Sequence, residues 1–306
     1  GVLLIYSHKM RLINIHKVNT LNVGDLVSSP SLYYSFDLPV IQLDITKLIN
    51  FKFEKNDVVL VGGGGLLEHT NFHNYLKKLI LIKEKYSKLI FWGVGKNSHF
   101  GRKKCLRLNK LDRSNKLLLS ANLVGVRDKS IFFEYVPCAS CLNPTFQKVI
   151  FNEPLHETIV YEHEAISFED NSLSKFPSLN NNNNKIKNKY LNKLLYFLFD
   201  GKYPKLKNNG LDEFDNILSF LSTGKNIITN TFHGAYWGLL LGRNVIVEPF
   251  STKFDVFIGH PNFYRFSKKG DWERFLKKKI VISDDYLKEC INSNNTFFKK
   301  VKKLIN

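Results

Sequence analysis

The chain has 306 residues, of which 43% are hydrophobic, and it carries 45 lysines and arginines against 27 aspartates and glutamates, a formal net charge of +18. This composition can bury a large core and suits two domains of moderate size, and no apolar run approaches the roughly 20 residues of a membrane-spanning helix. It argues against a disordered chain and an integral membrane protein, and it predicts a cytoplasmic protein with acidic partners such as phosphorylated small molecules or the inner membrane surface.

The first half of the chain alternates apolar strands with amphipathic helices. Strands are predicted in "RLINIHKV" (11–18), "DVVLV" (57–61), "KLIFWGV" (88–94) and "LVGV" (123–126), with a helix in "NYLKKLILIKEKY" (74–86) and another after the Arg-Asp turn at 127–128. Such alternation is typical of a parallel sheet covered by helices on both faces. We therefore expect residues 10–150 to form a Rossmann-like domain with its ligands at the carboxyl ends of the strands.

The second half repeats this alternation, beginning with a strand in "ETIVYEHEAIS". Residues 175–190 contain five consecutive asparagines, which cannot pack into a core, so we predict a polar insertion there. Helix, strand, helix and strand then follow in "DEFDNILSFLST", "KNIITN", "HGAYWGLLLG" and "NVIVEPF". We expect a second Rossmann-like domain over 155–275, a basic helical tail over 276–306, and a cleft between the two parallel-sheet domains.

Two glycine-rich turns follow neighbouring strands of the first domain. Residues 62–65 are four glycines directly after "DVVLV", and Gly95 and Lys96 follow the next strand in "GVGKN". Turns without side chains let a ligand approach the backbone and let N–H groups face an anion. Neither a P-loop ending nor a dinucleotide fingerprint is present. We predict ligand contacts at both turns, and the alternative is two tight strand-to-helix turns.

Polar residues follow two further strands. "NVGD" places Asn22 and Asp25 after the first strand, where Asp25 can cap a helix, accept a hydrogen bond from a sugar hydroxyl or act as a base. "VRDKS" places Arg127 at another strand end, where its guanidinium can bind a carboxylate or phosphate, or pair with Asp128. The residues alone leave these alternatives open.

The most distinctive stretch is "ITNTFHGAYWGLLLGRNVIVEPFSTKF" (228–254). Asn230 and Thr231 end a strand, and His233 and Gly234 open a helix, whose N-terminus offers free N–H groups and partial positive charge. An imidazole at that point suits phosphate binding or acid–base chemistry. The alternative for the imidazole is a plain structural hydrogen bond.

Four cysteines, Cys105, Cys138, Cys141 and Cys290, contain a single C-x-x-C pair. A zinc ribbon needs a second pair at related spacing, and a redox pair normally opens a helix after a strand, whereas Pro144 follows closely here. We therefore predict no metal site and reduced thiols.

The order of these motifs resembles the polysaccharide pyruvyl transferase family. N-x-G-D, a glycine-rich strand end, G-x-G, V-R-D and T-x-x-F-H-G follow one another between roughly Met10 and Phe254. The resemblance implies a GT-B-like pair of Rossmann domains that transfers a pyruvyl group from phosphoenolpyruvate to a sugar of a cell-surface polysaccharide or lipid-linked saccharide, forming a cyclic ketal. Two positions depart from the family: many members carry an arginine where Thr231 stands, and "VPCASC" replaces a segment that bears an aspartate.

The resemblance also implies roles, with the acceptor on the first domain and the donor on the second. His233 would protonate the methylene carbon of phosphoenolpyruvate, and Asp25 would act as base. Glu248 and Lys253 return to the same edge and can supply an acceptor and a cation. The donor is predicted to contact Gly62, Gly63, Gly64, Gly65, Lys96, Arg127, Asn230, Thr231, Gly234, Glu248 and Lys253, and the acceptor Asn22 and Gly95. Phosphoenolpyruvate is a co-substrate, and no further cofactor is expected.

Two other functions compete with this prediction. A GT-B-type glycosyltransferase would bind a nucleotide sugar at the same helix N-terminus, with Glu248 on the ribose, and threonine at position 231 favours it. A basic binding module would need exposed aromatic residues along a groove, whereas the aromatic residues here lie in apolar-periodic segments. We therefore predict no nucleic-acid partner.

Overall fold

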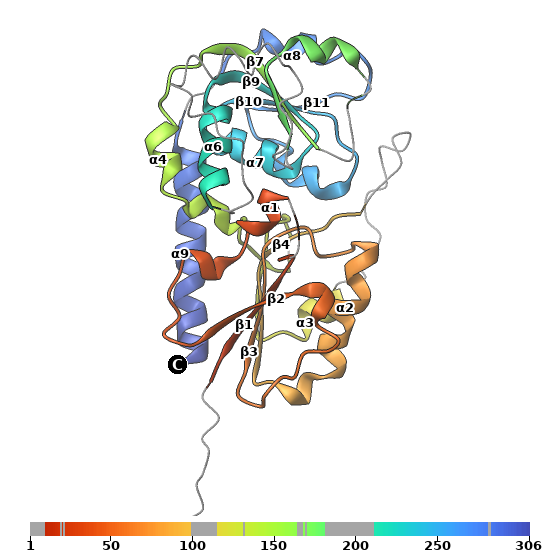
Figure 1. The fold of residues 1–306 in the computed structure, drawn as a ribbon, viewed down its shortest axis with the longest axis vertical. Coiled ribbons are helices and arrows are strands. Elements are labelled where there is room, and N and C mark those ends of the chain that lie inside the picture. The colour runs from red at the N-terminus through yellow and green to blue at the C-terminus, as the bar shows by residue number, and fades with distance from the viewer. Residues whose placement is uncertain are drawn as a thin grey trace, which may run out of the picture.

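The chain folds into two lobes, each built on a parallel sheet (Figure 1). A computed structural model describes residues 10–18, 20, 22–98, 115–130, 132–163, 168, 170–180, 211–280 and 283–306. The predicted asparagine-rich insertion from residue 181 onward and Cys105 lie outside these residues.

The first lobe contains six described strands, all parallel, in the order β2-β1-β3-β4-β5-β6. Every residue of β1 and β3 is buried, because helices and connecting segments cover both faces of the sheet, as an all-parallel sheet requires. The strands are β1 (Leu12–His16), β2 (Val40–Asp44), β3 (Val58–Gly62), β4 (Lys88–Val94), β5 (Leu123–Val126) and β6 (Glu134–Tyr135), and the described helices are α1 (Val23–Leu26), α2 (Thr70–Leu81) and α3 (Asn115–Leu119).

The second lobe contains five described strands, again all parallel, in the order β11-β10-β9-β7-β8. A buried helix, α7 (Phe232–Leu240), follows β9 directly and packs on the sheet. The strands are β7 (His156–Glu162), β8 (Ser178–Asn180), β9 (Gly224–Thr229), β10 (Asn244–Val247) and β11 (Phe263–Arg265), and the other described helices from residue 145 onward are α4 (Thr145–Val149), α6 (Leu211–Ser222), α8 (Glu273–Leu276) and α9 (Asp285–Ile305).

These two parallel α/β lobes confirm the predicted GT-B-like fold class. Two segments differ from the expected elements. The segment after the Arg-Asp turn forms β6, a two-residue edge strand, where a helix was expected, because Tyr135 and Glu134 pair with the end of β5. Within the range 175–190, β8 at residues 178–180 pairs with β7 and buries Leu179, so part of this polar stretch belongs to the sheet.

The C-terminal helix α9 runs along both lobes (Figure 1). Leu287 and Cys290 join the core of the second lobe, whereas Phe297 and Val301 pack with Trp92 in the first. Buried residues recur every three or four positions, so one face of the helix is apolar and enclosed. The basic tail predicted from the sequence therefore holds the two lobes together.

Removing the Phe297 ring is expected to destabilise the whole protein. The ring packs edge-on against Trp92 at a centroid distance of 5.1 Å and is fully buried. We expect Phe297→Ala to lower the free energy of unfolding by about 3–5 kcal/mol, measured by denaturant titration. Lys303→Ala, an exposed change on the same helix, should alter it by less than about 0.5 kcal/mol. Equal effects from the two variants would contradict this role for α9.

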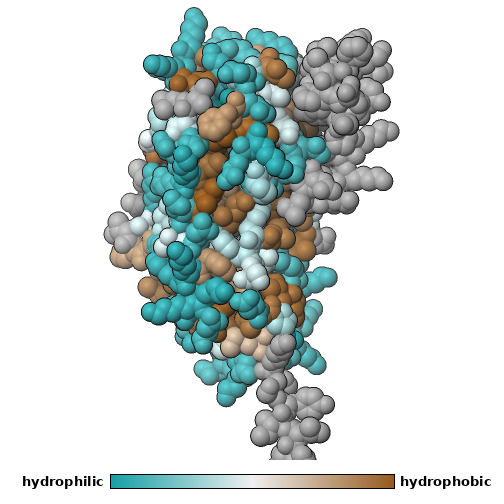
Figure 2. Space-filling view, turned by 90° about the vertical axis from the view of Figure 1, so that its left-hand side faces the viewer, coloured by the Kyte–Doolittle hydropathy of each residue, from teal (hydrophilic) through white to brown (hydrophobic). Residues whose placement is uncertain are grey.

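The face of the molecule that carries α4 and α9 mixes hydrophilic and hydrophobic residues (Figure 2). Two lysines of α9 form ion pairs with the first lobe: Lys300 Nζ lies 2.6 Å from Glu134 Oε2, and Lys302 Nζ lies 2.9 Å from Asp37 Oδ2.

None of the described helices combines the length and apolar character needed to cross a bilayer.

Candidate active site

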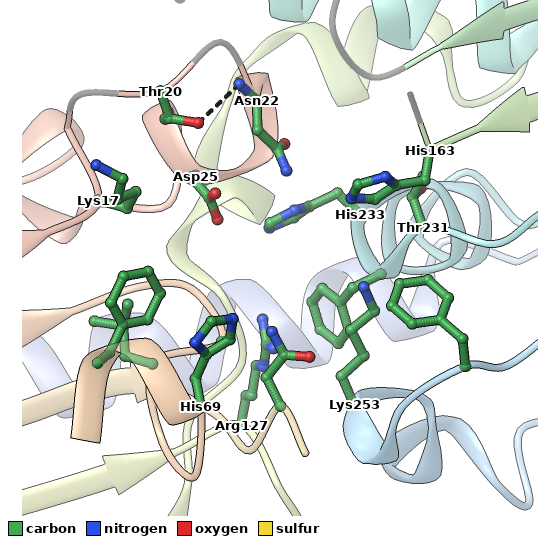
Figure 3. A pocket seen from close by; sticks show the side chains of 16 residues that line it. Lys17, Thr20, Asn22, Asp25, His69, Arg127, His163, Thr231, His233 and Lys253 are labelled. Atoms are coloured by element: carbon green, nitrogen blue, oxygen red, sulfur yellow. Dashed lines mark hydrogen bonds between the residues drawn. The ribbon is translucent and has the colours of Figure 1, made fainter. Parts of the chain in front are cut away.

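A cavity of about 230 Å³ lies where the carboxyl ends of the two sheets face each other (Figure 3). Both lobes contribute to it, since residues that follow β1, β5, β7, β9 and β10 all reach its wall. It is lined by Lys17, Thr20, Asn22, Asp25, Gly65, Leu66, His69, Phe72, Asn97 and Arg127 from the first lobe, and by His163, Thr231, Phe232, His233, Phe250 and Lys253 from the second.

The structure brings together both proposed catalytic residues and part of the proposed binding set. His233 projects from α7 toward Asp25 of α1, with Arg127 and Lys253 on the opposite wall (Figure 3). Of the residues predicted from the sequence, the cavity is lined by Asn22, Asp25, Gly65, Arg127, Thr231, His233 and Lys253. The others do not line it: Gly62, Gly63, Gly64, Gly95, Lys96, Asn230, Gly234 and Glu248.

The glycines behind the cavity wall make room for its functional side chains. A Cβ atom on Gly95 would lie 2.1 Å from Arg127 Nε, so only glycine lets the arginine pack at this strand end. Gly64 has a φ of +82°, which other residues rarely adopt, so this turn near Asp25 favours glycine. Gly95 therefore makes room for Arg127, and Gly65 is the one glycine predicted to contact a ligand that lines the cavity.

Other predicted residues shape the loops around the cavity. The Lys96 N–H donates to Asp128 Oδ2 at 2.7 Å, and Asn230 Oδ1 accepts from the His163 N–H at 2.7 Å. The Glu248 N–H donates to the carbonyl of Thr229 at 3.1 Å. These contacts fix the ends of β4, β7 and β10, from which cavity residues project.

Thr231, which stands where an arginine was expected from the family, is the N-cap of α7. Its Oγ1 accepts a hydrogen bond from the Gly234 N–H at 2.8 Å, so that N–H is already satisfied. Phe232 and His233 occupy the first two helical positions, where no carbonyl of the same helix can accept from an N–H. The helix therefore offers these two donors, and not Gly234, to a ligand.

Arg127 is a buried cation with unsatisfied donors. It is 2% exposed, and its guanidinium carbon lies 3.6 Å from the centre of the Phe232 ring. Its Nε and Nη1 atoms are buried and have no hydrogen-bond partner among the described residues. Burial lowers the pKa of Arg127, yet a guanidinium stays protonated in proteins. A buried charge with unpaired donors is unfavourable, so this position suits an anionic ligand.

Three further groups in the cavity have shifted pKa values. Burial, with help from Arg127, lowers the pKa of Lys253 to about 7, and Asp25 opposes this change. Burial raises the pKa of Asp25 to about 6 against the pull of the nearby cations. Burial, together with Arg127 and Lys253, lowers the pKa of His233 well below its usual value, so its ring is neutral at pH 7 without ligand. The empty cavity thus holds cations that disfavour one another.

Several cavity residues were missed by sequence reasoning. Lys17 and His163 directly follow β1 and β7, so the strand-end rule that selected Arg127 applies to them as well. His69 is the N-cap of α2, and its ring stacks on Phe72 at a centroid distance of 4.4 Å. No local sequence signal distinguishes His69 and Phe72 from ordinary packing residues. Among the described residues, no cluster of His, Cys, Asp and Glu has the arrangement of a metal site.

Comparisons with known proteins identify the family to which the chain belongs. The family model described as polysaccharide pyruvyl transferase matches residues 11–249. The comparison with curated proteins finds no match. Similar solved structures include an uncharacterized protein from Klebsiella pneumoniae (15% identity, TM-score 0.49, 84% of this chain and 93% of that chain) and a protein from Listeria monocytogenes described as a UDP-N-acetylglucosamine 2-epimerase (10%, 0.45, 94% and 89%). Because the matched segment spans both sheets and holds every cavity residue except Phe250 and Lys253, the chain belongs to the polysaccharide pyruvyl transferase family.

Proposed function

We propose that this protein transfers a pyruvyl group from phosphoenolpyruvate to two hydroxyls of one sugar in a cell-surface polysaccharide or lipid-linked saccharide. The observation that carries the proposal is the buried guanidinium of Arg127, with two unpartnered nitrogens, beside a buried lysine in the same small cavity. Phosphoenolpyruvate bears a carboxylate and a phosphate close together, and it can neutralise both cations at once. The family membership supports the same chemistry.

The two anionic groups of the donor suit different walls. Arg127 binds the carboxylate, because its planar fork matches two oxygens. The phosphate lies at the first turn of α7, where the N–H groups of Phe232 and His233 and the ammonium of Lys253 can reach it. Lys253 thereby supplies the positive charge that the family arginine would bring at position 231.

The proposed reaction uses two proton carriers. Protonated His233 gives its proton to the methylene carbon of the donor, and an acceptor hydroxyl attacks the neighbouring carbon while Asp25 takes its proton. A second hydroxyl of the same sugar then displaces the phosphate: the carbon–oxygen bond to phosphate breaks as the new bond forms, and the hydroxyl proton returns to His233. The leaving phosphate takes the proton from Asp25. Both residues end in their starting states.

Donor binding is part of this acid–base cycle. Burial, together with the positive charges of Arg127 and Lys253, lowers the pKa of His233 and keeps its ring neutral in the empty cavity. A bound phosphate and carboxylate reverse that local field and favour the imidazolium. The acid therefore forms when the donor is present.

The direct test incubates the purified protein with phosphoenolpyruvate and a panel of methyl glycosides and lipid-linked saccharides, and follows phosphate release. Acceptor-dependent release with a ketal product is expected. Consumption of a nucleotide sugar, with phosphoenolpyruvate ignored, would reject the proposal in favour of a glycosyltransferase. Binding of phosphoenolpyruvate alone is measured in parallel by calorimetry.

Lys253 is expected to make donor binding depend on pH. Its pKa of about 7 means that it is mostly protonated at pH 6 and mostly neutral at pH 8. An anion prefers the protonated form, so affinity should rise as pH falls. Relative to Lys253→Arg, which stays charged, wild-type affinity for phosphoenolpyruvate should rise about tenfold from pH 8 to pH 6 in calorimetric titrations. Parallel pH profiles for both proteins would show that Lys253 does not titrate on binding.

Peripheral contact with the inner membrane is a separate proposal, supported by the net charge of +18 and by acceptors of the lipid-linked class. The protein should co-sediment with vesicles that contain phosphatidylglycerol and dissociate as salt is raised. Binding that is absent at low salt, or equal on neutral vesicles, would exclude an electrostatic contact.

A further inference from the structure

The imidazole of His233 is held in one orientation. The residue is 8% exposed, and its ring lies 5.0 Å from the Trp237 ring, centroid to centroid. A Cβ atom on Gly24 would lie 1.9 Å from His233 Nδ1, so the Nδ1 edge packs directly on α1, the helix that carries Asp25. The other ring nitrogen, Nε2, lies 3.8 Å from the sulfur of Cys138, within the range of hydrogen bonds to sulfur.

Cys138 lies in a chain of hydrogen-bonding groups that runs from Trp237 through Ser140 to His233. Trp237 Nε1, which can only donate, donates to Ser140 Oγ at 3.0 Å. The Ser140 hydroxyl is then free to donate onward to Cys138 Sγ, which lies 3.3 Å away. When Ser140 donates in this direction, the thiol proton can point at His233 Nε2. Since burial raises the pKa of Cys138, the sulfur keeps its proton at neutral pH.

The backbone around Cys138 is fixed from both lobes. The Tyr236 hydroxyl on α7 donates to the carbonyl of Cys138 at 3.0 Å. Asn294 Nδ2 on α9 donates to the carbonyl of Pro137 at 3.3 Å. Cys138 is 1% exposed, so the thiol cannot turn toward solvent without moving this segment, which connects the two lobes.

We propose that Cys138 is the positioning residue of His233: its S–H group donates to Nε2 and keeps the proton of the neutral imidazole on Nδ1, the nitrogen that faces α1. A thiol is neutral, and it gives the imidazolium less stabilisation than a carboxylate would. The charged groups that face the ring are Arg127, Lys253 and Asp25. A second proton can enter only at Nε2, so the S–H must first rotate away from that nitrogen, and Arg127 and Lys253 oppose the added charge until a donor anion offsets them.

The uptake of a second proton on donor binding rests on the proposed function, whereas the position of the proton on the neutral ring does not. The tautomer is therefore measured without donor, by long-range ¹H–¹⁵N correlation spectra of the labelled protein, with the His233 signals assigned through their loss in His233→Gln. We expect a protonated Nδ1 and an unprotonated Nε2 in the wild type. Cys138→Ser, which keeps a donor, should preserve this pattern, and Cys138→Ala should shift both nitrogen signals toward a mixture of tautomers.

Cys141→Ala is the matched control, because this buried thiol of the same C-x-x-C pair accepts from Asn294 Nδ2 at 3.4 Å and should leave the His233 signals unchanged. A protonated Nε2 in the wild type would overturn the inference, even if a variant fails to fold. So would an unchanged pattern in Cys138→Ala. Calorimetry with phosphoenolpyruvate separates the two claims: loss of donor binding with the expected tautomer would reject the proposed function alone.

Discussion

Arg127→Met is expected to weaken phosphoenolpyruvate binding by about 100-fold or more while raising the stability of the unliganded protein. The binding loss corresponds to roughly 3 kcal/mol, the size of charge-assisted hydrogen bonds to a buried carboxylate. Stability should rise by about 1–3 kcal/mol because methionine removes a buried cation whose Nε and Nη1 have no partner among the described residues. Calorimetric titration measures the first effect, and thermal unfolding without ligand measures the second.

Arg243→Met is the matched control. Arg243 is also buried, at 1% exposure, but its Nη2 donates to the carbonyls of Asn152 and Ser222 at 2.6 and 3.0 Å. It lies outside the cavity, so this variant should lose stability and keep wild-type affinity for phosphoenolpyruvate. If Arg127→Met were instead the destabilised variant and bound the donor normally, the anion site would be wrong.

If Arg127→Met stabilises the unliganded protein and Arg243→Met destabilises it, the unfavourable interactions between charges lie in the cavity. Burial and the charge of Arg127 lower the pKa of Lys253, and Asp25 is the one acidic residue in the described lining. A ligand that supplies negative charge relieves this repulsion, and part of its binding free energy comes from that relief. Burial and the same two cations keep His233 neutral until the donor arrives.

Sequence rules located much of this cavity because parallel sheets place their ligands at strand ends. Asp25, Arg127, His233 and Lys253 all follow predicted strands, and all line the cavity. The alternation of apolar strands and helices was likewise enough to predict two parallel sheets. These features depend on local pattern, which a single sequence contains.

The remaining features depend on contacts between distant segments. Nothing near Gly95 indicates that its missing side chain accommodates Arg127, and nothing near Cys138 indicates that it meets His233, 95 positions later. The sequence predicts a basic helix at the end of the chain, whereas its role in holding the two lobes together depends on the packing of Phe297 against Trp92. Such contacts follow from three-dimensional packing, which periodicity and composition do not specify.

Asp25→Asn is expected to reduce turnover by about 10²–10⁴-fold without weakening donor binding, if Asp25 accepts the proton of the acceptor hydroxyl. The substitution removes a negative charge beside an anionic donor, so affinity for phosphoenolpyruvate should stay equal or increase. Burial raises the pKa of Asp25 to about 6 in the empty cavity, and the bound anionic donor raises it further, so the wild-type rate should fall as pH drops from 8 toward 5 and the base becomes protonated. Rates of phosphate release between pH 5 and pH 8 at saturating donor test this.

Asp255→Asn provides the control for this substitution, since Asp255 lies on the same 3₁₀ turn as Lys253 (Thr252–Phe257), pairs with Arg265 at 2.9 Å and does not line the cavity. It should keep both the rate and the fall toward pH 5. Asp25→Asn should lose that fall, because the group that titrates is gone. If its residual activity still declined toward pH 5 as in the wild type, another group would be the base, and Asp25 would act only through its charge on the bound donor.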